Sequence, residues 1–433
     1  MAAFATGNAG DTVLGATTIS EGMLMYYTLI GTTLLSPIVG TVMALLFLFR
    51  KHKHFAWSEL GHHTLTKGLL LLAAWSTITA YVGGHWISLA ASVVLWLYLG
   101  VVLYMQSESK SLHDFAKYGN WILFFGVLSA AAGFMQYVGL IGPGGFPIAP
   151  PWLGYVLGLK SFVPDPENRI TATFGNANIA GAWFSVLAIM STYYLYQVRT
   201  RWKKAVYLAL IAIFVSSLLM TSSRGAIIAL MCAMFVYFYF SFKHLRVALT
   251  VAFAAVVTML FLYPSLLPRS DLLRESLLDR LTIWKICLRL FMQHPIEGVG
   301  LANTYFVDAI RFGYYRIAHA HNTVLAMFVE LGTIGGAIFL WMHWSLAKYV
   351  FYLKKLNHRS VPVILALFSF FLVHGLVDYT LMSPQIGIIY IVLSGYVIRT
   401  WKEVSVERKK TEALHRRWLL EQARRAAKAS GAL

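Results

Sequence analysis

Long runs of apolar residues recur along this chain, and they limit the folds that it can adopt. A helix needs about 18–20 apolar residues to cross the hydrocarbon core of a bilayer. The chain is 58% hydrophobic and only 12% charged, whereas soluble domains are about a quarter charged. We therefore expect an all-α polytopic membrane protein with about eleven or twelve transmembrane helices. The expected spans are 24–49, 68–83, 86–106, 119–141, 176–197, 204–221, 224–242, 246–263, 323–348, 361–380 and 384–400.

The basic residues give these spans an orientation. The net charge is +18, and most Lys and Arg fall at alternate span ends, at 50–67, 110–117, 199–204, 243–246, 348–359 and from 399 onward. The positive-inside rule assigns that side to the cytoplasm. Eleven spans would then leave the N-terminus outside. We attribute this positive charge to topology and to contact with anionic membrane lipids, and expect no nucleic-acid partner.

Two segments on the outer side are too long to be simple turns, and segments of this length are usually functional. The first, 142–175, is rich in Gly and Pro, and the second closes at Asn322. We divide the chain into 1–263 (N-terminal transmembrane helices), 264–322 (outer loop), 323–400 (C-terminal transmembrane helices) and 401–433 (basic cytoplasmic tail).

The second outer segment contains an amphipathic pattern from Ser270, the predicted N-cap, to about His294. Its apolar residues are Leu273, Leu277, Leu281, Trp284, Leu288 and Phe291. Basic residues lie between them, so the pattern is typical of a helix on the outer membrane surface. Cys287 lies in this helix and Cys232 in an apolar span, so we expect no disulfide.

The segment ends with His319-Ala320-His321-Asn322, directly before the span 323–348. An imidazole at the lip of a membrane helix is close to both water and lipid. His321 could accept a proton from a hydroxyl or donate a hydrogen bond to a phosphate. The alternative is an interfacial histidine that only caps the following helix.

An arginine stands at the outer junction of two other spans, in Thr221-Ser222-Ser223-Arg224-Gly225-Ala226. In the first turn of a helix, the Arg224 charge opposes the helix dipole unless it has an anionic partner. Ser222 or Ser223 can cap this helix. Arg224 could therefore clamp a phosphate; the alternative is an arginine that only snorkels to the membrane surface.

Other polar residues on the outer side are candidates with competing structural roles. Arg280 precedes Trp284 by one helical turn and could reach a pyrophosphate, with Arg274, Lys285 and Arg289 as alternatives. For each of these four residues the structural alternative is a solvated basic face. Further along, Asn176 and Asn178 open a span and could cap it or bind sugar hydroxyls. Near the outer end of another span, His374 and Asp378 share the i, i+4 spacing of one helix face. These two could form a functional site or a structural pair.

Some motifs are absent from the sequence. There is no Walker A loop, no HExxH motif and no Asp-x-Asp pair, and the two cysteines lack zinc-site spacing. We therefore expect chemistry without a metal or a cofactor.

Taken together, these motifs resemble the O-antigen ligase family, within a superfamily that also includes O-antigen polymerases and protein O-oligosaccharyltransferases. The resemblance covers about residues 170–380 and rests on the order and outer-side placement of the motifs. It implies twelve spans with both ends cytoplasmic, a GT-C-like architecture and a large, partly helical periplasmic loop. The matching elements are Gly175-Asn176-Ala177-Asn178, Ser223-Arg224-Gly225-Ala226, the Arg280/Trp284 helix, Pro295-Ile296-Glu297-Gly298-Val299-Gly300, His319-Ala320-His321-Asn322 and Glu330-Leu331-Gly332.

The resemblance also implies a function. It is metal-independent, inverting transfer of O-antigen glycan from undecaprenyl pyrophosphate to a sugar hydroxyl of lipid A–core, at the periplasmic face of the bacterial inner membrane. In that reading His321 is the base, and Arg224 and Arg280 stabilise the pyrophosphate. The substrate-binding candidates are His319, Asn322, Asn176, Asn178, Trp284, Lys285, Arg289 and Asp378. Alternative functions are an O-antigen polymerase, a protein O-oligosaccharyltransferase and, more distantly, a lipid-linked glycan transporter.

Overall fold

The computed structural model describes residues 37–108, 112–140, 169–307, 319–356 and 358–429. Within these ranges all regular structure is helical, which confirms the predicted all-α class. The short helices are α3 (Glu59–His62) and a set of three-residue 3-10 helices, labelled η: η1 (His52–His54), η3 (Lys243–Leu245), η4 (Pro264–Leu266), η5 (Ser270–Leu272), η6 (Thr304–Phe306) and η8 (Thr380–Met382). Its longer helices are α2 (Pro37–Lys51), α4 (Thr64–Val82), α5 (Trp86–Glu108), α6 (Leu112–Tyr137), α8 (Ala177–Gln197), α9 (Arg201–Met220), α10 (Arg224–Ser241), α11 (Arg246–Leu262), α12 (Leu273–Gln293), α13 (Thr323–Lys355), α14 (Val361–Gly375) and α15 (Pro384–Ala429).

Eight helices of the described part are long and apolar enough to cross a membrane: α4, α5, α6, α8, α9, α10, α11 and α13. The protein is therefore a multi-pass membrane protein. The predicted first span, 24–49, begins outside the described residues. Most of the predicted outer segment 142–175 also lies outside them. The total of eleven or twelve spans stays a prediction, and so does the division of the chain into four parts.

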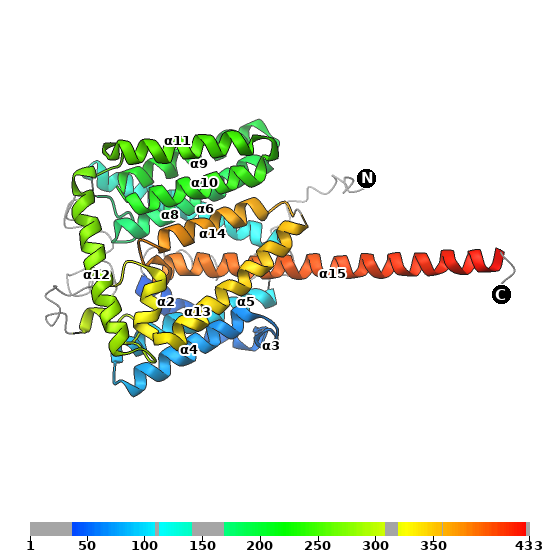
Figure 1. Cartoon of the computed structure of the whole chain (residues 1–433), viewed down its shortest axis with the longest axis horizontal. Helices are drawn as coiled ribbons and strands as arrows, with labels where there is room; N and C mark the ends of the chain where they lie inside the picture. Colours follow the sequence, from blue (N-terminus) through cyan, green and yellow to red (C-terminus); the bar gives the residue numbers. More distant parts are fainter. Residues whose placement is uncertain (1–36, 109–111, 141–168, 308–318, 357, 430–433) are drawn as a thin grey trace.

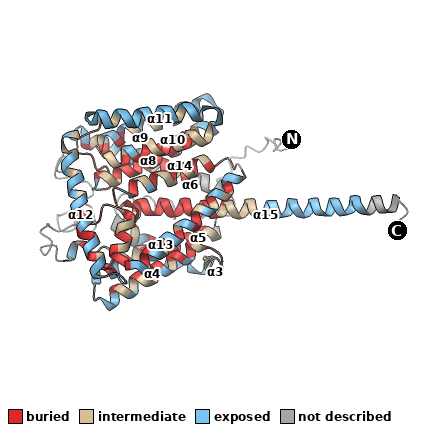
Figure 2. Cartoon of the chain, in the orientation of Figure 1, coloured by how far each residue is buried: buried red, intermediate tan, exposed pale blue. Residues whose placement is uncertain are grey.

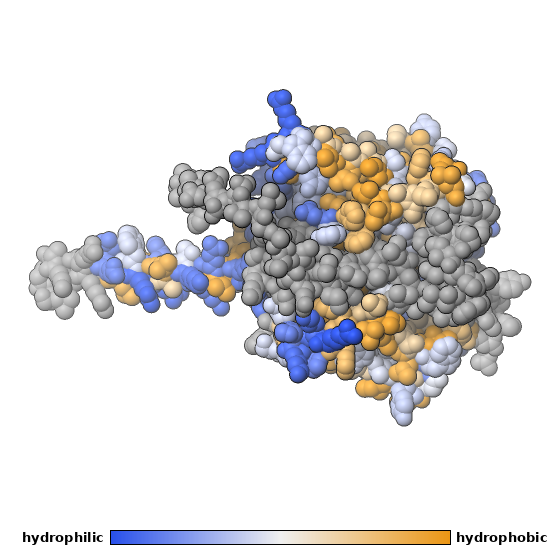
Figure 3. Space-filling model, turned by 180° about the vertical axis from the view of Figure 1, so that it is seen from behind, coloured by the Kyte–Doolittle hydropathy of each residue, from blue (hydrophilic) through white to orange (hydrophobic). Residues whose placement is uncertain are grey.

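The bundle has α15 near its centre (Figure 1). Helices α8, α9, α10 and α14 lie on one side of it, and α4, α5 and α13 lie on the other. The first part of α15 is buried, as Ile386 and Ile398 show, whereas its last part projects away from the bundle and is exposed (Figure 2). One continuous helix thus joins the last apolar span to the basic tail. On the face seen in Figure 3, apolar surface covers much of the bundle, and the most hydrophilic residues gather towards the end from which α15 leaves.

Helix α12 lies across one end of the bundle, nearly perpendicular to the apolar helices (Figure 1). This confirms the predicted helix in the outer loop. The predicted N-cap is wrong, because Ser270 belongs to the short turn η5 and Leu272 precedes α12. The docked face consists of Ile283, Ile286, Cys287 and Leu290, which pack against the residues around Ala320 and Val329.

Part of the predicted apolar stripe of α12 points away from the docked face. Leu277, Leu281 and Leu288 are about half exposed, whereas Trp284 and Phe291 pack beside the docked face. Because the leucines lie next to the rim of an apolar bundle, their position suits a helix partly immersed in the membrane surface.

Two glycine-containing motifs, 295–300 and 330–332, contact each other through their backbones. The backbone of 295–300 pairs with α13 at its kink: Val299 N donates to the Val329 carbonyl at 2.9 Å, and Gly300 N to the Glu330 carbonyl at 2.9 Å. At the kink Gly332 has φ +66°, a conformation that strongly favours glycine. A Cβ on Gly298 or Gly332 would collide with the opposite backbone. This contact fixes residues 295–300 of the outer loop against α13.

The docked face of α12 predicts the reactivity of Cys287. Burial raises the pKa of its thiol to about 12, so almost no thiolate exists at neutral pH and alkylation should be slow. In a Cys232→Ser background, N-ethylmaleimide should label Cys287 only after denaturation, as measured by mass spectrometry. Thr282→Cys, on the exposed side of the same helix, is the control in a background without native cysteines. If native Cys287 reacts as fast as that control, α12 does not dock through this face.

Candidate active site

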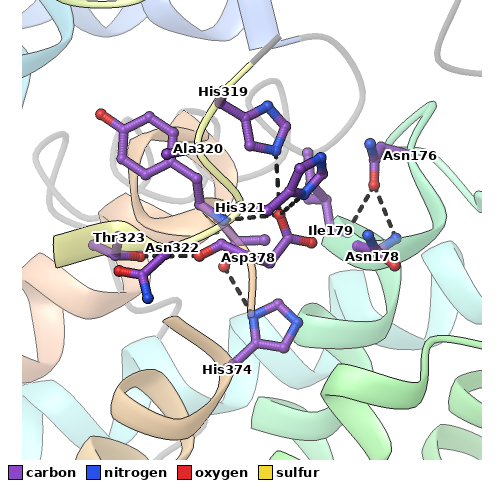
Figure 4. A network of polar contacts seen from close by, with 12 residues as sticks. Asn176, Asn178, Ile179, His319, Ala320, His321, Asn322, Thr323, His374 and Asp378 are labelled. Atoms are coloured by element: carbon purple, nitrogen blue, oxygen red, sulfur yellow. Dashed lines mark hydrogen bonds and ion pairs between the residues drawn. The ribbon is translucent and has the colours of Figure 1, made fainter. Parts of the chain in front are cut away.

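Two histidines turn toward one carboxylate where the outer loop meets α13 (Figure 4). His319 Nε2 lies 3.3 Å from Asp378 Oδ1, and His321 Nδ1 lies 3.5 Å from the same oxygen. The two imidazole centroids are 4.1 Å apart. Asp378 Oδ1 also accepts a hydrogen bond from Tyr379 N at 2.8 Å. The structure therefore brings together three of the predicted site residues.

Asp378 is buried, with only 5% of its surface exposed. Burial alone would raise the pKa of its carboxyl group. The ring nitrogens of His319 and His321, which lie 3.3 and 3.5 Å from Oδ1, outweigh that effect and hold the pKa well below its usual range. Asp378 is therefore a carboxylate at neutral pH, and its charge can orient both imidazoles and stabilise a positive charge on either of them.

The backbone at His321 is strained. Its φ is +47°, a left-handed conformation that non-glycine residues adopt only when the surroundings impose it. Trp284 contributes to this constraint, because its indole N–H donates to the Ala320 carbonyl at 3.0 Å. The structure thus gives Trp284, predicted to bind substrate, a role in holding the turn between the two histidines.

Asn322 caps α13. Its Oδ1 accepts from Leu325 N at 2.9 Å, and its Nδ2 donates to the Leu376 carbonyl at 3.1 Å. Both ends of this amide have protein partners, so Asn322 is better suited to joining the His-Ala-His turn to the segment after α14 than to binding sugar. The adjacent Thr323 makes a parallel connection, from its Oγ1 to the Asp378 carbonyl at 3.1 Å.

The prediction that His374 and Asp378 share one helix face is wrong, although their charges act on each other. Helix α14 ends at Gly375, and the chain turns there, with Asp378 N bonded to the His374 carbonyl at 2.9 Å. His374 Nδ1 lies 3.1 Å from Thr380 Oγ1 instead. The turn is what frees the Asp378 side chain to face the histidines, and it also ends the predicted span 361–380 early.

Arginines gather at the start of α10. Arg224 Nη1 donates to the Arg269 carbonyl at 2.7 Å. The charges of Arg269, Arg280 and Arg169 all act on Arg224, and Asp271 is the carboxylate that acts on it. In the described part of the chain no ion pair joins a carboxylate to Arg224 or Arg280. Concentrated positive charge of this kind suits an anion with several oxygens.

The arginines lie beside the histidine–aspartate group. A Cβ on Gly225, next to Arg224, would come within 2.8 Å of Val377 Cγ2, next to Asp378. The charge of Arg280 also acts on His374, which lies one turn before Asp378 in the chain. Arg280 and Trp284 are one helical turn apart on α12, and Trp284 contacts the His-Ala-His turn. Residues from α10, α12 and α13 and from the segment after α14 therefore border one region.

The asparagines of the Gly-Asn-Ala-Asn motif have different roles. Asn176 is the N-cap of α8, and its Oδ1 accepts from Asn178 N at 2.8 Å. Asn178 Oδ1 accepts from Arg169 Nη2 at 2.8 Å and from Ser223 Oγ at 3.1 Å. Ser223 is at the N-cap position of α10, but its side chain does not cap that helix. Asn178 thus joins the starts of α8 and α10 to Arg169.

Two predicted residues lie away from these contacts. Lys285 and Arg289 are exposed on α12, and no contact in the described part of the chain joins them to the histidines or to Arg224. Their proposed contact with substrate stays a prediction.

Sequence reasoning did not select three residues that shape this region. Arg169 donates to the Thr221 carbonyl at 2.9 Å as well as to Asn178. Glu330 is 1% exposed and accepts hydrogen bonds from Tyr379 OH at 2.9 Å and Ala302 N at 3.0 Å. Tyr379 thereby ties the Asp378 turn to the kink of α13. An acidic residue inside an apolar span was the available signal for Glu330.

His319, His321 and Asp378 could also hold a metal ion. Their ligand atoms lie within 4.8 Å of one another, and two imidazoles with one carboxylate suit a transition metal. The same three groups can also move a proton without any metal. The sequence-based expectation of metal-free chemistry is therefore open to a direct test.

Comparison with known proteins gives two matches. Residues 209–340 match the family model described as O-antigen ligase. This range contains Arg224, Arg280 and both histidines, but not Asp378. A Rickettsia conorii protein named as a candidate polysaccharide ligase is 26% identical over 117 residues, which cover 25% of this chain and 28% of that protein. The chain thus matches little more than a quarter of that relative's length.

Proposed function

We propose, on the premise that the chain belongs to the O-antigen ligase family through residues 209–340, that it moves O-antigen glycan from undecaprenyl pyrophosphate to lipid A–core. We place this reaction at the periplasmic face of the bacterial inner membrane. The observation that carries the proposal is the shared border of the arginines around Arg224 and the histidine–aspartate group around Asp378. The arginines can bind the negatively charged pyrophosphate, and a histidine can act as the base that accepts a proton from the acceptor hydroxyl.

The reaction needs one bond to form and one to break. An acceptor sugar hydroxyl attacks the anomeric carbon of the donor glycan, and its proton passes to an imidazole. The bond between that carbon and the pyrophosphate oxygen breaks, and undecaprenyl pyrophosphate leaves with the electron pair. A single displacement of this kind inverts the anomeric configuration.

His321 is our choice for the base. Its Nδ1 faces the Asp378 carboxylate, so a proton on Nδ1 leaves Nε2 free to accept the proton of the acceptor hydroxyl. Asp378 then stabilises the imidazolium. His319 meets the same carboxylate through Nε2, and we assign it to substrate binding. The strained backbone of His321 supports choosing His321 and not His319 as the base, because strain of this kind concentrates at functional sites.

Arg224 and Arg280 are our choice for stabilising the leaving group. Pyrophosphate gains negative charge as the glycosidic bond breaks, and fixed guanidinium groups stabilise that charge without reorganising. Each guanidinium can bind two oxygens of a phosphate at once. Asn176, Asn178 and the exposed Lys285 and Arg289 would contact sugars or phosphates around this centre.

The decisive assay uses purified protein in liposomes with carrier-linked glycan as donor. Three acceptors are offered separately: lipid A–core, a second carrier-linked glycan and an acceptor protein. We expect glycan on lipid A–core. Lengthened carrier-linked glycan would instead identify a polymerase, and glycosylated protein an oligosaccharyltransferase. Movement of the lipid-linked donor across the membrane with no product would identify a transporter.

Chelation separates proton transfer from metal chemistry. Because His319, His321 and Asp378 suffice for proton transfer, removing divalent ions with EDTA should change the transfer rate by less than about twofold. The measurement is the initial rate of product formation before and after dialysis against EDTA, and again after Zn²⁺ or Mn²⁺ is added back. Loss of activity on chelation with recovery on one ion would replace the base assignment with a metal site.

A further inference from the structure

A cavity lies at the opposite end of the bundle from the candidate active site. Helices α8 and α10 begin beside Asn178 and Arg224, and their last residues, Gln197 and Ser241, line this cavity. Its volume is about 510 Å³, within the range of ligand-binding pockets. The lining residues are Tyr193, Tyr196, Gln197, Tyr237, Phe240, Ser241, Phe242, Lys243, Arg246, Lys354, His358, Arg359, Val361 and Pro362.

Positive charge converges on this cavity from separate segments. Lys243 lies in η3 and Arg246 is the first residue of α11, whereas Lys354 comes from the end of α13 and Arg359 from the segment before α14. No carboxylate belongs to the described lining. Within the described ranges, none of these four cations forms an ion pair. The positive-inside rule accounts for basic residues at this end, but it does not require them to share one cavity.

Aromatic groups, not carboxylates, position two of these cations. The Arg246 guanidinium lies 5.0 Å from the ring centre of Tyr239, and its Nε donates to the Tyr239 carbonyl at 3.1 Å. Lys354 Nζ lies 4.9 Å from the ring centre of Phe240. Such contacts hold a cation in place and leave its charge available to another anion. The hydroxyl of Tyr193, on which the Arg359 charge acts, adds a hydrogen-bond donor to the lining.

Apolar surface flanks the cavity. Helix α11, which begins at Arg246, has no buried residue. Its Val247 is 79% exposed, and Phe351, one turn before Lys354, is 55% exposed. A ligand with a charged head and hydrocarbon chains would match both features, with its head among the cations and its chains along α11. A small water-soluble phosphate would leave the apolar surface unused.

We propose that this cavity binds the phosphate headgroup of an anionic phospholipid from the leaflet that the positive-inside rule assigns to the cytoplasm. Basic pockets between transmembrane helices bind such headgroups in this way. The site is separate from the active site and does not depend on the proposed reaction. It explains why cations from separate segments meet at a cavity whose described lining contains no carboxylate. The carboxylate of Glu403 is in electrostatic contact with the lining, where it acts on His358, and it is paired with Arg399.

The test uses phosphatidylcholine nanodiscs with increasing dioleoyl phosphatidylglycerol, and native mass spectrometry counts the lipids that the protein retains. Each cation near a membrane surface contributes about fivefold to the affinity for anionic lipid. Lys354→Gln/Arg359→Gln, two exposed positions, should therefore weaken retention by about 30-fold. Lys243→Gln/Arg246→Gln, on the other side of the cavity, should weaken it similarly.

The matched control is Lys203→Gln/Lys204→Gln. These lysines are exposed in the first turn of α9, at the same end of the bundle, but do not line the cavity. This double variant should retain the lipid as the wild type does. Equal losses in control and cavity variants would overturn the proposal in favour of a diffuse basic surface. Binding of inorganic phosphate or pyrophosphate as tightly as the lipid, lost in the same variants, would overturn the lipid as the ligand.

Discussion

Substituting His321 by Ala is expected to slow glycan transfer by about 10²–10⁴-fold, the usual contribution of a positioned general base. The acceptor hydroxyl would then have no nearby group to accept its proton. Asp378 cannot replace the imidazole, because its pKa is held well below its usual range and its carboxylate is therefore a weak base. The measurement is the initial rate with purified carrier-linked donor and saturating lipid A–core.

His319→Ala is the matched comparison, because His319 faces the same carboxylate at nearly the same distance. The assignment requires a smaller loss in His319→Ala, with the change mainly in the acceptor concentration needed for half-maximal rate. If His321→Ala keeps near-full activity while His319→Ala loses it, the two roles are reversed. If both variants stay active, no histidine of this group is the base.

Arg224→Lys is expected to lower the transfer rate by about 10²–10³-fold, as loss of one fixed donor to a developing charge does in other enzymes. Lysine keeps the positive charge but loses the planar fork that binds two phosphate oxygens. It also cannot reproduce the geometry of the bond to the Arg269 carbonyl. The effect should appear mainly in the maximal rate, measured as release of undecaprenyl pyrophosphate.

Arg201→Lys provides the control for that substitution. Arg201 is the first residue of α9 as Arg224 is of α10, but it is exposed at the other end of the bundle. Its replacement should leave transfer unchanged. Full activity in Arg224→Lys would show that charge alone is sufficient there and would remove the phosphate clamp from the account.

Much of the fold could be predicted from local patterns. Apolar runs locate the spans because each helix must satisfy its own backbone in lipid, and the periodicity after Ser270 located α12 within a few residues. Asn176 is a helix cap, as its position before a span suggested. The face on which α12 docks was only partly predictable, because Ile283 and Ile286 fit the surface around Ala320 whereas Leu277 and Leu281 do not.

The candidate site was harder to predict, since it depends on contacts between distant segments. The i, i+4 spacing of His374 and Asp378 suggested one helix face, but α14 stops at Gly375 and the resulting turn gives Asp378 different partners. Arg169 joins Asn178 through packing of segments that no local pattern describes. Asn322 was predicted to bind substrate, yet both ends of its amide hold backbone groups.

The most direct test is a cryo-EM structure of the protein with undecaprenyl pyrophosphate bound in a nanodisc. The account predicts density for the two phosphates within hydrogen-bonding distance of the Arg224 and Arg280 guanidinium groups, with the first phosphate on the side of His321 and Asp378. Diphosphate density elsewhere, for example at the basic cavity by Arg246 and Lys354, with none beside Arg224, would contradict it.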